Sequence, residues 1–495
     1  MQDFFKWFSQ NRQLTKPWLM LGKGPSFSLV DQYDTDGYHI ISLNHAVRHH
    51  KTLLAHMIDF DVPVDCAEAI DRNAQYLLMP WIPHVHNVPT HQNLEELLQE
   101  HETLRKLYHE KRILWYNLVT GPVKKEDSPV VPVSFFSAEA VLNLLAMAGV
   151  KTVRSLGIDG GNTYSSNFKD ITETKLLANG HQTFDHQFKH IARTIMEKKI
   201  DYAPLNVESP IKVYVGTGQE QLIPTKVLEY SIRKNTSMSV EVFPLYQSNI
   251  KMPMPKDPAN KPRTPFSFQR FIIPQLNGFR GKAIYVDSDM QVFTDLRKLW
   301  DKPFEGGDIL AAYEAEGTGR RPQFSVMLMD CQALAWDINH IVAQLDRGEL
   351  DYAKLMYEMR VAKNIRPVIE REWNSLEYYE EGKTNLLHYT DMNKQPWLYR
   401  NNAFGHVWVR ELAEAMDKGF ITRREIAEHI RWGNLRPSLL YQLKHKHFEV
   451  TDLPAEAKRL DAFFVPPHLR NAQTPKSTLL LHKLLVKAAL AYYRF

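Results

Sequence analysis

Cysteine, long apolar runs and a strong excess of one charge are all missing from this 495-residue sequence. Two cysteines, Cys66 and Cys331, cannot form a disulfide framework, so we expect a reducing compartment. No stretch of about 20 apolar residues is present, which argues against a membrane-spanning helix. The net charge of +4 is too small for wholesale nucleic-acid binding. We therefore expect a cytoplasmic protein that binds no nucleic acid.

The first residues, MQDFFKWFSQNRQ, lack the apolar core and the cleavage site of a signal peptide. Internal repeats and low-complexity tracts are absent as well. Apolar residues make up 44% and charged residues 24%, which excludes disorder as the main state. At about 150 residues per domain, the length predicts two or three domains.

The first 200 residues alternate short apolar runs with helical stretches. We expect strands at 18–21, 39–43 and 152–156, and helices at 92–112 and 138–147. This alternation is typical of an α/β unit with a largely parallel sheet. Residues 203–210 contain two prolines and no periodicity, so they are the candidate linker.

The same pattern restarts after this linker. A helix is expected at 224–233 and a proline-rich loop at 251–265, and the expected strands are 212–215, 240–245, 283–286, 309–313 and 326–329. The fold class is therefore α/β, with two Rossmann-like domains and a helical basic tail. The predicted boundaries are 1–205, 211–450 and 451–495, and we expect the two domains to fold separately.

Beyond Asp461 the sequence has no acidic residue but five basic ones. Four of them fall on one helical face, because steps of 7, 11 and 18 residues return close to the same angle; they are Lys476, Lys483, Lys487 and Arg494. One interpretation of residues 470–495 is a basic amphipathic helix on an anionic membrane surface. The other is a terminal helix that packs on its own protein.

The sharpest local signal is the segment IYVDSDM, residues 284–290. An apolar strand ends there and delivers Asp287 and Asp289 at positions i and i+2. Two adjacent carboxylates repel each other unless a cation lies between them. Their hard oxygen atoms suit Mg²⁺ or Mn²⁺, which bridge carboxylates to substrate phosphates. Taken alone, the motif favours a polar strand end with two solvated acids, because a lone Asp-x-Asp is common.

The surrounding motifs sharpen this interpretation. They are PFSFQRFIIPQL at 265–276, FSVMLMD at 324–330, EWN at 372–374 and HYTDMNKQPW at 388–397. In this order they resemble glycosyltransferase family 8, whose GT-A-fold members include bacterial lipopolysaccharide sugar transferases and glycogenin. The resemblance covers about residues 211–442.

The resemblance implies a nucleotide-sugar site with a bound divalent ion, Mn²⁺ or Mg²⁺. The donor-binding residues would be Val215, Gly216, Thr217, Arg270, Asp287, Ser288, Asp289, Ser325 and Lys394. The metal ligands would be Asp287, Asp289 and His388. Lys394 and the ion would stabilise the charge of the leaving diphosphate. The strand at 323–326 reads QFSV instead of the usual Asn-Ala-Gly or Asn-Ser-Gly, and no nucleophile or base is identified between 350 and 359.

The first domain carries a second set of motifs. They are LGKGPS at 21–26, ISLN at 41–44, MIDFD at 57–61, and the stretch from SAE at 137–139 to GID at 157–159. Over about residues 15–170 they resemble the sialyltransferases of glycosyltransferase family 42 and the motility accessory factor proteins. This resemblance implies a second nucleotide site at Gly22, Gly24, Ser26, Asn44 and Asp159. The family's catalytic histidine corresponds to His181, His186 or His190, and a degenerate domain kept for folding or acceptor binding is the alternative.

Together these signals predict a metal-dependent glycosyltransferase of the hexosyltransferase type. It would move a sugar from a UDP-linked donor to a glycan or lipid-linked acceptor, with retention, in surface polysaccharide or lipopolysaccharide synthesis. It would work at the inner face of a membrane and be bifunctional if the first domain is active too. One alternative is an Asp-x-Asp phosphohydrolase, although that class wants Thr where this chain has Gln291. The other is a non-catalytic scaffold that binds nucleotide sugars.

Overall fold

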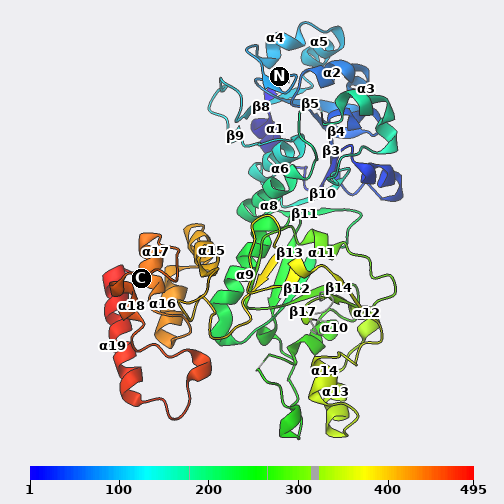
Figure 1. The fold of residues 1–495 in the computed structure, drawn as a ribbon. Helices are drawn as coiled ribbons and strands as arrows, with labels where there is room; N and C mark the ends of the chain where they lie inside the picture. Colours follow the sequence, from blue (N-terminus) through cyan, green and yellow to red (C-terminus); the bar gives the residue numbers. More distant parts are fainter. Residues whose placement is uncertain (178, 265, 314–322) are drawn as a thin grey trace. The chain divides into compact units, whose positions relative to one another are not determined.

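The computed structural model describes residues 1–177, 179–264, 266–313 and 323–495. The chain divides into two compact units (Figure 1). The first unit holds Met1–Pro210 with Thr236–Ser239, and the second holds Ile211–Asn235 with Val240–Phe495. In the described part of the chain, no helix is long and apolar enough to cross a membrane.

The first unit is built on a parallel sheet in the order β1-β8-β5-β4-β3-β2-β10-β11, with β9 paired to β8. Its strands are β1 (Gln2–Asp3), β2 (Trp18–Leu21), β3 (His39–Leu43), β4 (Thr52–His56), β5 (Ala74–Pro80), β8 (Ile113–Leu118), β9 (Val130–Val131), β10 (Thr152–Leu156) and β11 (Asp201–Pro204). Strands buried on both faces read as continuous apolar runs, as in the fully buried WLML of β2. The expected α/β architecture is confirmed for this unit.

Helices and two short strands complete the first unit. They are α1 (Phe4–Gln10), α2 (Asp61–Asp65), α3 (Ala67–Asn73), α4 (Leu94–Leu98), α5 (Glu102–His109), α6 (Ser137–Met147), α7 (Thr172–Lys175), α8 (His186–Lys198), β6 (His84–Val85) and β7 (Val88–Pro89). The single exposed helix expected at 92–112 is instead two helices, because a capping box at Asn93 starts α4 and His101 lies extended before α5. The expected linker at 203–210 is also corrected, since its first two residues belong to β11.

The second unit is built on a mixed sheet in the order β13-β12-β14-β17-β16-β18. These strands are β13 (Val240–Pro244), β12 (Ile211–Gly216), β14 (Lys282–Asp287), β17 (Gln323–Asp330), β16 (Ile309–Ala312) and β18 (Ile365–Ile369). β12 runs parallel to β13 and β14, whereas β17 runs antiparallel to β14 and β16. This unit is also α/β, as expected, and Pro265 of the predicted loop lies outside the described residues.

A small second sheet lies beyond the end of β14. It has the order β15-β20-β19, formed by β15 (Met290–Val292), β20 (Leu386–His388) and β19 (Ser375–Leu376). Met290 of β15 pairs with His388 of β20. This pairing brings a residue from the later part of the chain next to the Asp-x-Asp motif.

The helices of the second unit fall into two groups. The first group is α9 (Leu222–Asn235), α10 (Ile273–Leu276), α11 (Arg297–Trp300), α12 (Cys331–Leu334), α13 (Ile338–Asp346) and α14 (Tyr352–Met356). The second is α15 (Gly405–Asp417), α16 (Arg423–Trp432), α17 (Leu439–His445), α18 (Ala455–Leu460) and α19 (Lys476–Tyr493), the orange and red helices of Figure 1. Lys234 of α9 pairs with Glu411 and Glu414 of α15, so these late helices pack on the sheet domain.

The C-terminal helix α19 packs against α16, α17 and α18 of its own unit. Its buried face is His482, Val486, Ala489, Leu490 and Tyr493. Leu480, Leu481, Leu484 and Tyr492 stay exposed, together with Lys476, Lys483 and Lys487. The helix is thus packed, as one of the two interpretations states, yet its outer face presents leucine and lysine side chains side by side. Arg470 does not belong to that face, because its guanidinium donates to the carbonyls of Val465, Trp432 and Gly433.

Candidate functional site

The carboxyl ends of two neighbouring parallel strands form the centre of the site in the second unit. Gly216, the last residue of β12, pairs with Asp287, the last residue of β14. Parallel strands end at the same edge of a sheet, so the groups that follow each strand meet there. The turn after β14 then delivers Asp289, whose carbonyl accepts a hydrogen bond of 2.8 Å from the backbone N–H of Tyr389.

Asp287, Asp289 and His388 converge at this edge. Each offers one ligand atom, and these atoms lie within 4.8 Å of one another. Nε2 of His388 is 3.2 Å from Oδ1 of Asp289. His388 is 4% exposed, so neighbouring protein groups fix the orientation of its imidazole.

The pKa values of Asp287 and His388 in this cluster are both raised. Burial raises the pKa of Asp287, and the neighbouring Asp289 raises it further, against the lowering effect of Arg270 and His388. Burial lowers the pKa of His388, but the carboxylates of Asp289, Asp287 and Glu377 outweigh it and leave the value raised. A divalent cation would supply the same positive charge at the same place.

Arg270 lies beside the cluster, in the 3-10 turn η7 (Gln269–Ile272). Its guanidinium donates to the carbonyl of Phe324 at 2.9 Å and to the hydroxyl of Tyr285 at 3.0 Å, and it covers the Tyr285 ring at 4.5 Å. It is also 3.7 Å from Oδ1 of Asp287. Arg270 is therefore a buried residue of the site, and the surface ion pair that its residue type alone would favour is not what the structure contains.

Tyr285 joins Arg270 to the first carboxylate. Its hydroxyl donates to Oδ1 of Asp287 at 2.5 Å. This hydroxyl also determines the residue at the end of β12, because a Cβ on Gly216 would lie 2.3 Å from it. Gly216 is thus required by a side chain of the protein itself, whatever ligand lies above it.

Two amides fix the other ligands from behind. Oδ1 of Asn374 lies 2.9 Å from Nδ1 of His388, which leaves Nε2 to face Asp289. Nε2 of Gln395 donates to Oδ2 of Asp289 at 3.1 Å. Such second contacts orient metal ligands and select the histidine tautomer that can bind.

The remaining predicted donor residues lie around this centre with different exposure. Val215 is buried in the core, and Thr217 is buried with its hydroxyl 3.0 Å from that of Thr225. Ser288 is 1% exposed and donates to Gln221, so its side chain braces the turn and is not open to a ligand. Ser325 is half-buried on β17, and Lys394 is half-exposed, 3.3 Å from Asp391.

The glycine turn of the first unit differs from its expected role. The N–H groups of Gly22 and Gly24 donate to the carbonyls of Leu156 and Gly157, at 2.8 and 2.9 Å. A Cβ on Gly22 would lie 2.3 Å from the Gly157 carbonyl. These glycines therefore let two loops of the protein touch, and their N–H groups are already used within the protein.

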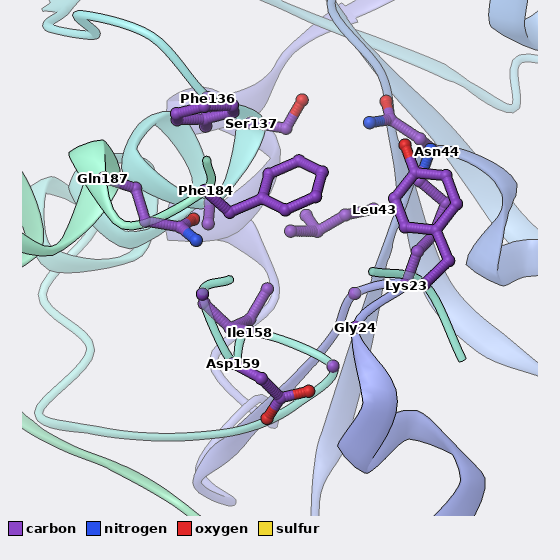
Figure 2. Close-up of a pocket in the computed structure, with 15 residues that line it drawn as sticks. Lys23, Gly24, Leu43, Asn44, Phe136, Ser137, Ile158, Asp159, Phe184 and Gln187 are labelled. Carbon is purple, nitrogen blue, oxygen red and sulfur yellow. The ribbon is translucent and has the colours of Figure 1, made fainter. Parts of the chain in front are cut away.

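Ser26 and Asp159 also bind each other across the same two loops. The N–H of Ser26 donates to Oδ2 of Asp159 at 2.7 Å, and the N–H of Gly157 donates to Oγ of Ser26 at 2.7 Å. Gly22, Gly24, Asn44 and Asp159 nevertheless line one pocket (Figure 2). Asn44 and Ser137 lie on one side of it and Asp159 on the opposite side.

This pocket continues into a larger cavity of about 540 Å³. The two share Lys23, Asn44, Phe136, Ser137, Tyr164 and Phe184. Of the three candidate histidines, His181 lines the larger cavity. His190 lies instead 3.0 Å from Oγ of Ser134, and His186 lies edge-on to Phe135. The site prediction for the first unit stays a prediction, with His181 as its best-placed histidine.

Comparison with known proteins gives a family match that falls mostly in the second unit. Residues 194–352 match the model of Glycosyl transferase family 8. The chain carries a glycosyltransferase family 8 domain. The resemblance inferred from the ordered motifs is thereby confirmed over residues 211–352, whereas the family 42 resemblance of residues 15–170 stays a prediction.

Among individual proteins, Protein CDI of Arabidopsis thaliana is 30% identical over 96 residues, 19% of this chain and 37% of that protein. The chain thus spans well under half the length of this relative. The glycosyltransferase GlyE of Streptococcus pneumoniae TIGR4 has 15% identity and a TM-score of 0.31, covering 43% of this chain and 64% of GlyE. The galactosyltransferase LgtC, solved with donor and acceptor sugar analogues, has 11% identity and a TM-score of 0.30, covering 42% of this chain and all of LgtC.

The ligand atoms of Asp287, Asp289 and His388 fit a divalent ion. Two carboxylates and one neutral imidazole suit Mn²⁺, and the carboxylates also suit Mg²⁺. Sequence reasoning named the three side chains that converge here but assigned no role to Tyr285, Asn374 or Gln395, which contact them. Tyr285 was open to inference, since residues two apart on a strand share a face. Asn374 and Gln395 lie in the quoted motifs, but only the folded chain shows which ligand each one contacts.

Proposed function

We propose that this protein is a metal-dependent glycosyltransferase that moves a sugar from a UDP-linked donor to a glycan or lipid-linked acceptor. The observation that carries the proposal is the convergence of Asp287, Asp289 and His388 at the strand ends of a family 8 domain. The reaction would retain the anomeric configuration, and its products would serve surface polysaccharide or lipopolysaccharide synthesis.

The residues of the chain divide the work by their chemistry. Asp287, Asp289 and His388 would hold Mn²⁺ or Mg²⁺, which neutralises charge on the diphosphate as the glycosidic bond breaks. Lys394 is half-exposed on a turn next to Gln395, so its ammonium can swing from Asp391 to a leaving phosphate. Arg270 keeps Asp287 oriented through Tyr285. No group of the described chain is assigned as nucleophile or base.

The two alternatives make different demands on the same site. A phosphohydrolase would use one of the carboxylates as a nucleophile, which needs a carboxylate free to attack. Here Asp287 accepts from Tyr285, and Asp289 contacts both His388 and Gln395, so both are arranged as ligands. A non-catalytic scaffold would not need a metal-binding site. All three residues predicted to form one are present, which argues against the scaffold.

The test is a screen of nucleotide sugars for nucleotide release by the full chain, with Mn²⁺, with Mg²⁺ and with EDTA. We expect release from at least one uridine-linked sugar in the presence of Mn²⁺, and reversible loss of release in EDTA. Release that is equally fast in EDTA would refute the metal-dependent reaction. Release of inorganic phosphate from simple phosphate esters would favour the phosphohydrolase.

We also propose that the first unit binds a nucleotide or nucleotide sugar, which would make the protein bifunctional if the unit is catalytic. The supporting observation is the continuous cavity with aromatic rings from Phe136, Tyr164 and Phe184, since bases stack on such rings. Lys23, whose ammonium lies 4.2 Å from the Tyr164 ring centre, adds positive charge. Calorimetry with cytidine and uridine nucleotides tests the idea, using a Phe184→Ala variant as the matched control. No binding at millimolar concentration would leave an acceptor-binding or structural unit.

We further propose that α19 contacts an anionic membrane surface and brings the family 8 domain to a lipid-linked acceptor. Leu480 and Leu484 are 59% and 57% exposed, and Lys483 and Lys487 are exposed on the same helix. Each cation near an anionic leaflet contributes about 1 kcal/mol, so the attachment would be reversible and sensitive to salt. The protein would then act at the inner face of the membrane.

A further inference from the structure

The loop that carries Gln395 has no regular secondary structure to hold it. Residues 391–399 form consecutive turns between β20 and α15. Gln395 is nevertheless 3% exposed, and its amide donates both to Oδ2 of Asp289 and to the carbonyl of Tyr389, at 3.1 and 3.3 Å. The position of this amide therefore depends on whatever fixes the chain after it.

Arg436 fixes that chain. Its backbone N–H donates to the carbonyl of Trp397, and its Nε donates to the carbonyl of Pro396, both at 2.8 Å. Arg436 thus binds the carbonyls of the two residues that follow Gln395, one through its side chain and one through its backbone. Arg436 comes from the stretch between α16 and α17, so the contact joins the late helices of the unit to the ligand loop.

Arg436 is itself held on all sides. It is 0% exposed, and its two terminal nitrogens donate to Oγ of Ser438 and to Oε1 of Gln442. Asp461 accepts from the N–H and the hydroxyl of Ser438, at 2.8 and 2.6 Å, and pairs with Arg400 at 3.1 Å. Burial lowers the pKa of Arg436 only to about 10, so the guanidinium remains charged at neutral pH.

Burying a guanidinium is unfavourable unless hydrogen bonds and counter-charge offset the loss of water. Apolar residues of similar volume would fill the same space at least as stably. What they could not do is bind the Pro396 carbonyl and two side-chain oxygens in one rigid plane, which is the property of an arginine fork. The hydrogen bonds of Arg436 therefore fix the position of its partners more than they stabilise the fold.

We propose that Arg436 is a positioning residue of the metal site, which acts through Pro396 and Trp397 to keep Gln395 on Asp289. This inference rests on the proposed metal-dependent function. It extends the working site beyond the residues that touch the ion or the donor, and it gives α16, α17 and Asp461 a task in the reaction.

The test measures Mn²⁺ binding directly, by electron paramagnetic resonance of the free ion, in the full chain. The variants are Arg436→Lys, Gln395→Leu and the double variant, with Arg424→Lys as the matched control. Arg424 lies on α16 with 85% of its side chain exposed and pairs only locally with Glu428. Lys keeps the charge of Arg436 but cannot make the fork.

We expect Arg436→Lys to weaken Mn²⁺ binding about fivefold to tenfold, at the lower end of what contacts behind metal ligands contribute. Arg424→Lys should have no effect. Because Arg436 acts through Gln395, the double variant should bind no more weakly than the weaker single variant. Effects that multiply in the double variant, or an unchanged affinity in Arg436→Lys, would overturn the inference.

Two further outcomes are distinguishable. If the parent binds no Mn²⁺, the proposed function fails and takes this inference with it. If Arg436→Lys does not fold, as judged by circular dichroism, Ser438→Ala replaces it, because this smaller change removes one partner of the guanidinium and its link to Asp461. If Ser438→Ala and Gln395→Leu then both bind Mn²⁺ with the affinity of the parent, the role of the network is refuted.

Discussion

Replacing Asp289 by Asn separates the role of the metal site in the reaction from its role in the fold. The amide has the shape of the carboxylate, so it can still accept from Gln395, and the backbone bond from Tyr389 to residue 289 is untouched. What is lost is one charge, which sits 3.2 Å from His388 and also raises the pKa of Asp287. The attraction and the repulsion that disappear act in opposite directions on stability.

We therefore expect Asp289→Asn to change the free energy of unfolding by no more than about 1 kcal/mol, the scale of one exchanged polar contact. The loss in the reaction should be far larger. Replacing a charged carboxylate at a hard cation by a neutral amide oxygen costs about 3 kcal/mol or more of transition-state stabilisation, which is roughly a hundredfold or more in rate.

The assay is nucleotide release at saturating Mn²⁺, with thermal unfolding measured on the same sample. Asp301→Asn is the matched control, because Asp301 is 43% exposed and pairs with Arg297 on the surface of the same unit. Turnover of Asp289→Asn within tenfold of the parent would refute the metal assignment. A drop in melting temperature as large as that of a core truncation would show that the carboxylate acts in the fold instead.

Four other outcomes follow from the same structure. Gly216→Ala should lower turnover at least tenfold while the protein stays folded, since its Cβ would lie 2.3 Å from the Tyr285 hydroxyl, and turnover equal to the parent would show that this hydroxyl is dispensable. Mn²⁺ affinity should fall as pH drops through the raised pKa of His388, because a proton and the ion compete for one lone pair; a titration that shows the fall only below pH ~6.5 contradicts the shift. Residues 211–495 expressed alone should be folded with a cooperative melt, and an aggregated fragment would mean that the two units share a core. Leu484→Glu should abolish sedimentation with anionic vesicles at low salt, and a parent that never sediments removes the membrane proposal.

Strands were the most predictable part of this chain. The runs at 18–21, 39–43 and 152–156 are strands with those bounds, and the first of them, WLML, is apolar and buried at every position, as a strand covered on both faces should be. The helix expected at 92–112 was wrong in its continuity. Its composition is helical throughout, but the cap at Asn93 and the extended residue at His101 divide it.

The three residues that converge at the strand ends could be named from spacing and resemblance, whereas the groups that contact them could not. Asn374 and Gln395 are ordinary polar residues on turns, and nothing local marks their partners. The glycine pair of the first unit has a reason within the fold itself. A glycine pair after a strand is typical of a phosphate-binding turn, yet Gly22 is needed because another loop of the protein, at Gly157, approaches it.

The pairing of β15 with β20 has a consequence for how the site comes into being. Asp287 and Asp289 stand together as soon as β14 ends, but His388 reaches them only after a long stretch of chain has found its place. Contacts between such distant residues form after local structure, since the entropy of closing the loop must be overcome first. The cluster of three side chains therefore belongs to the native state alone, and an ion held by it would bind that state in preference to the unfolded one. By linkage such an ion would raise the midpoint of thermal unfolding as its concentration increases, so it would affect how much of this protein is folded as well as how fast it works.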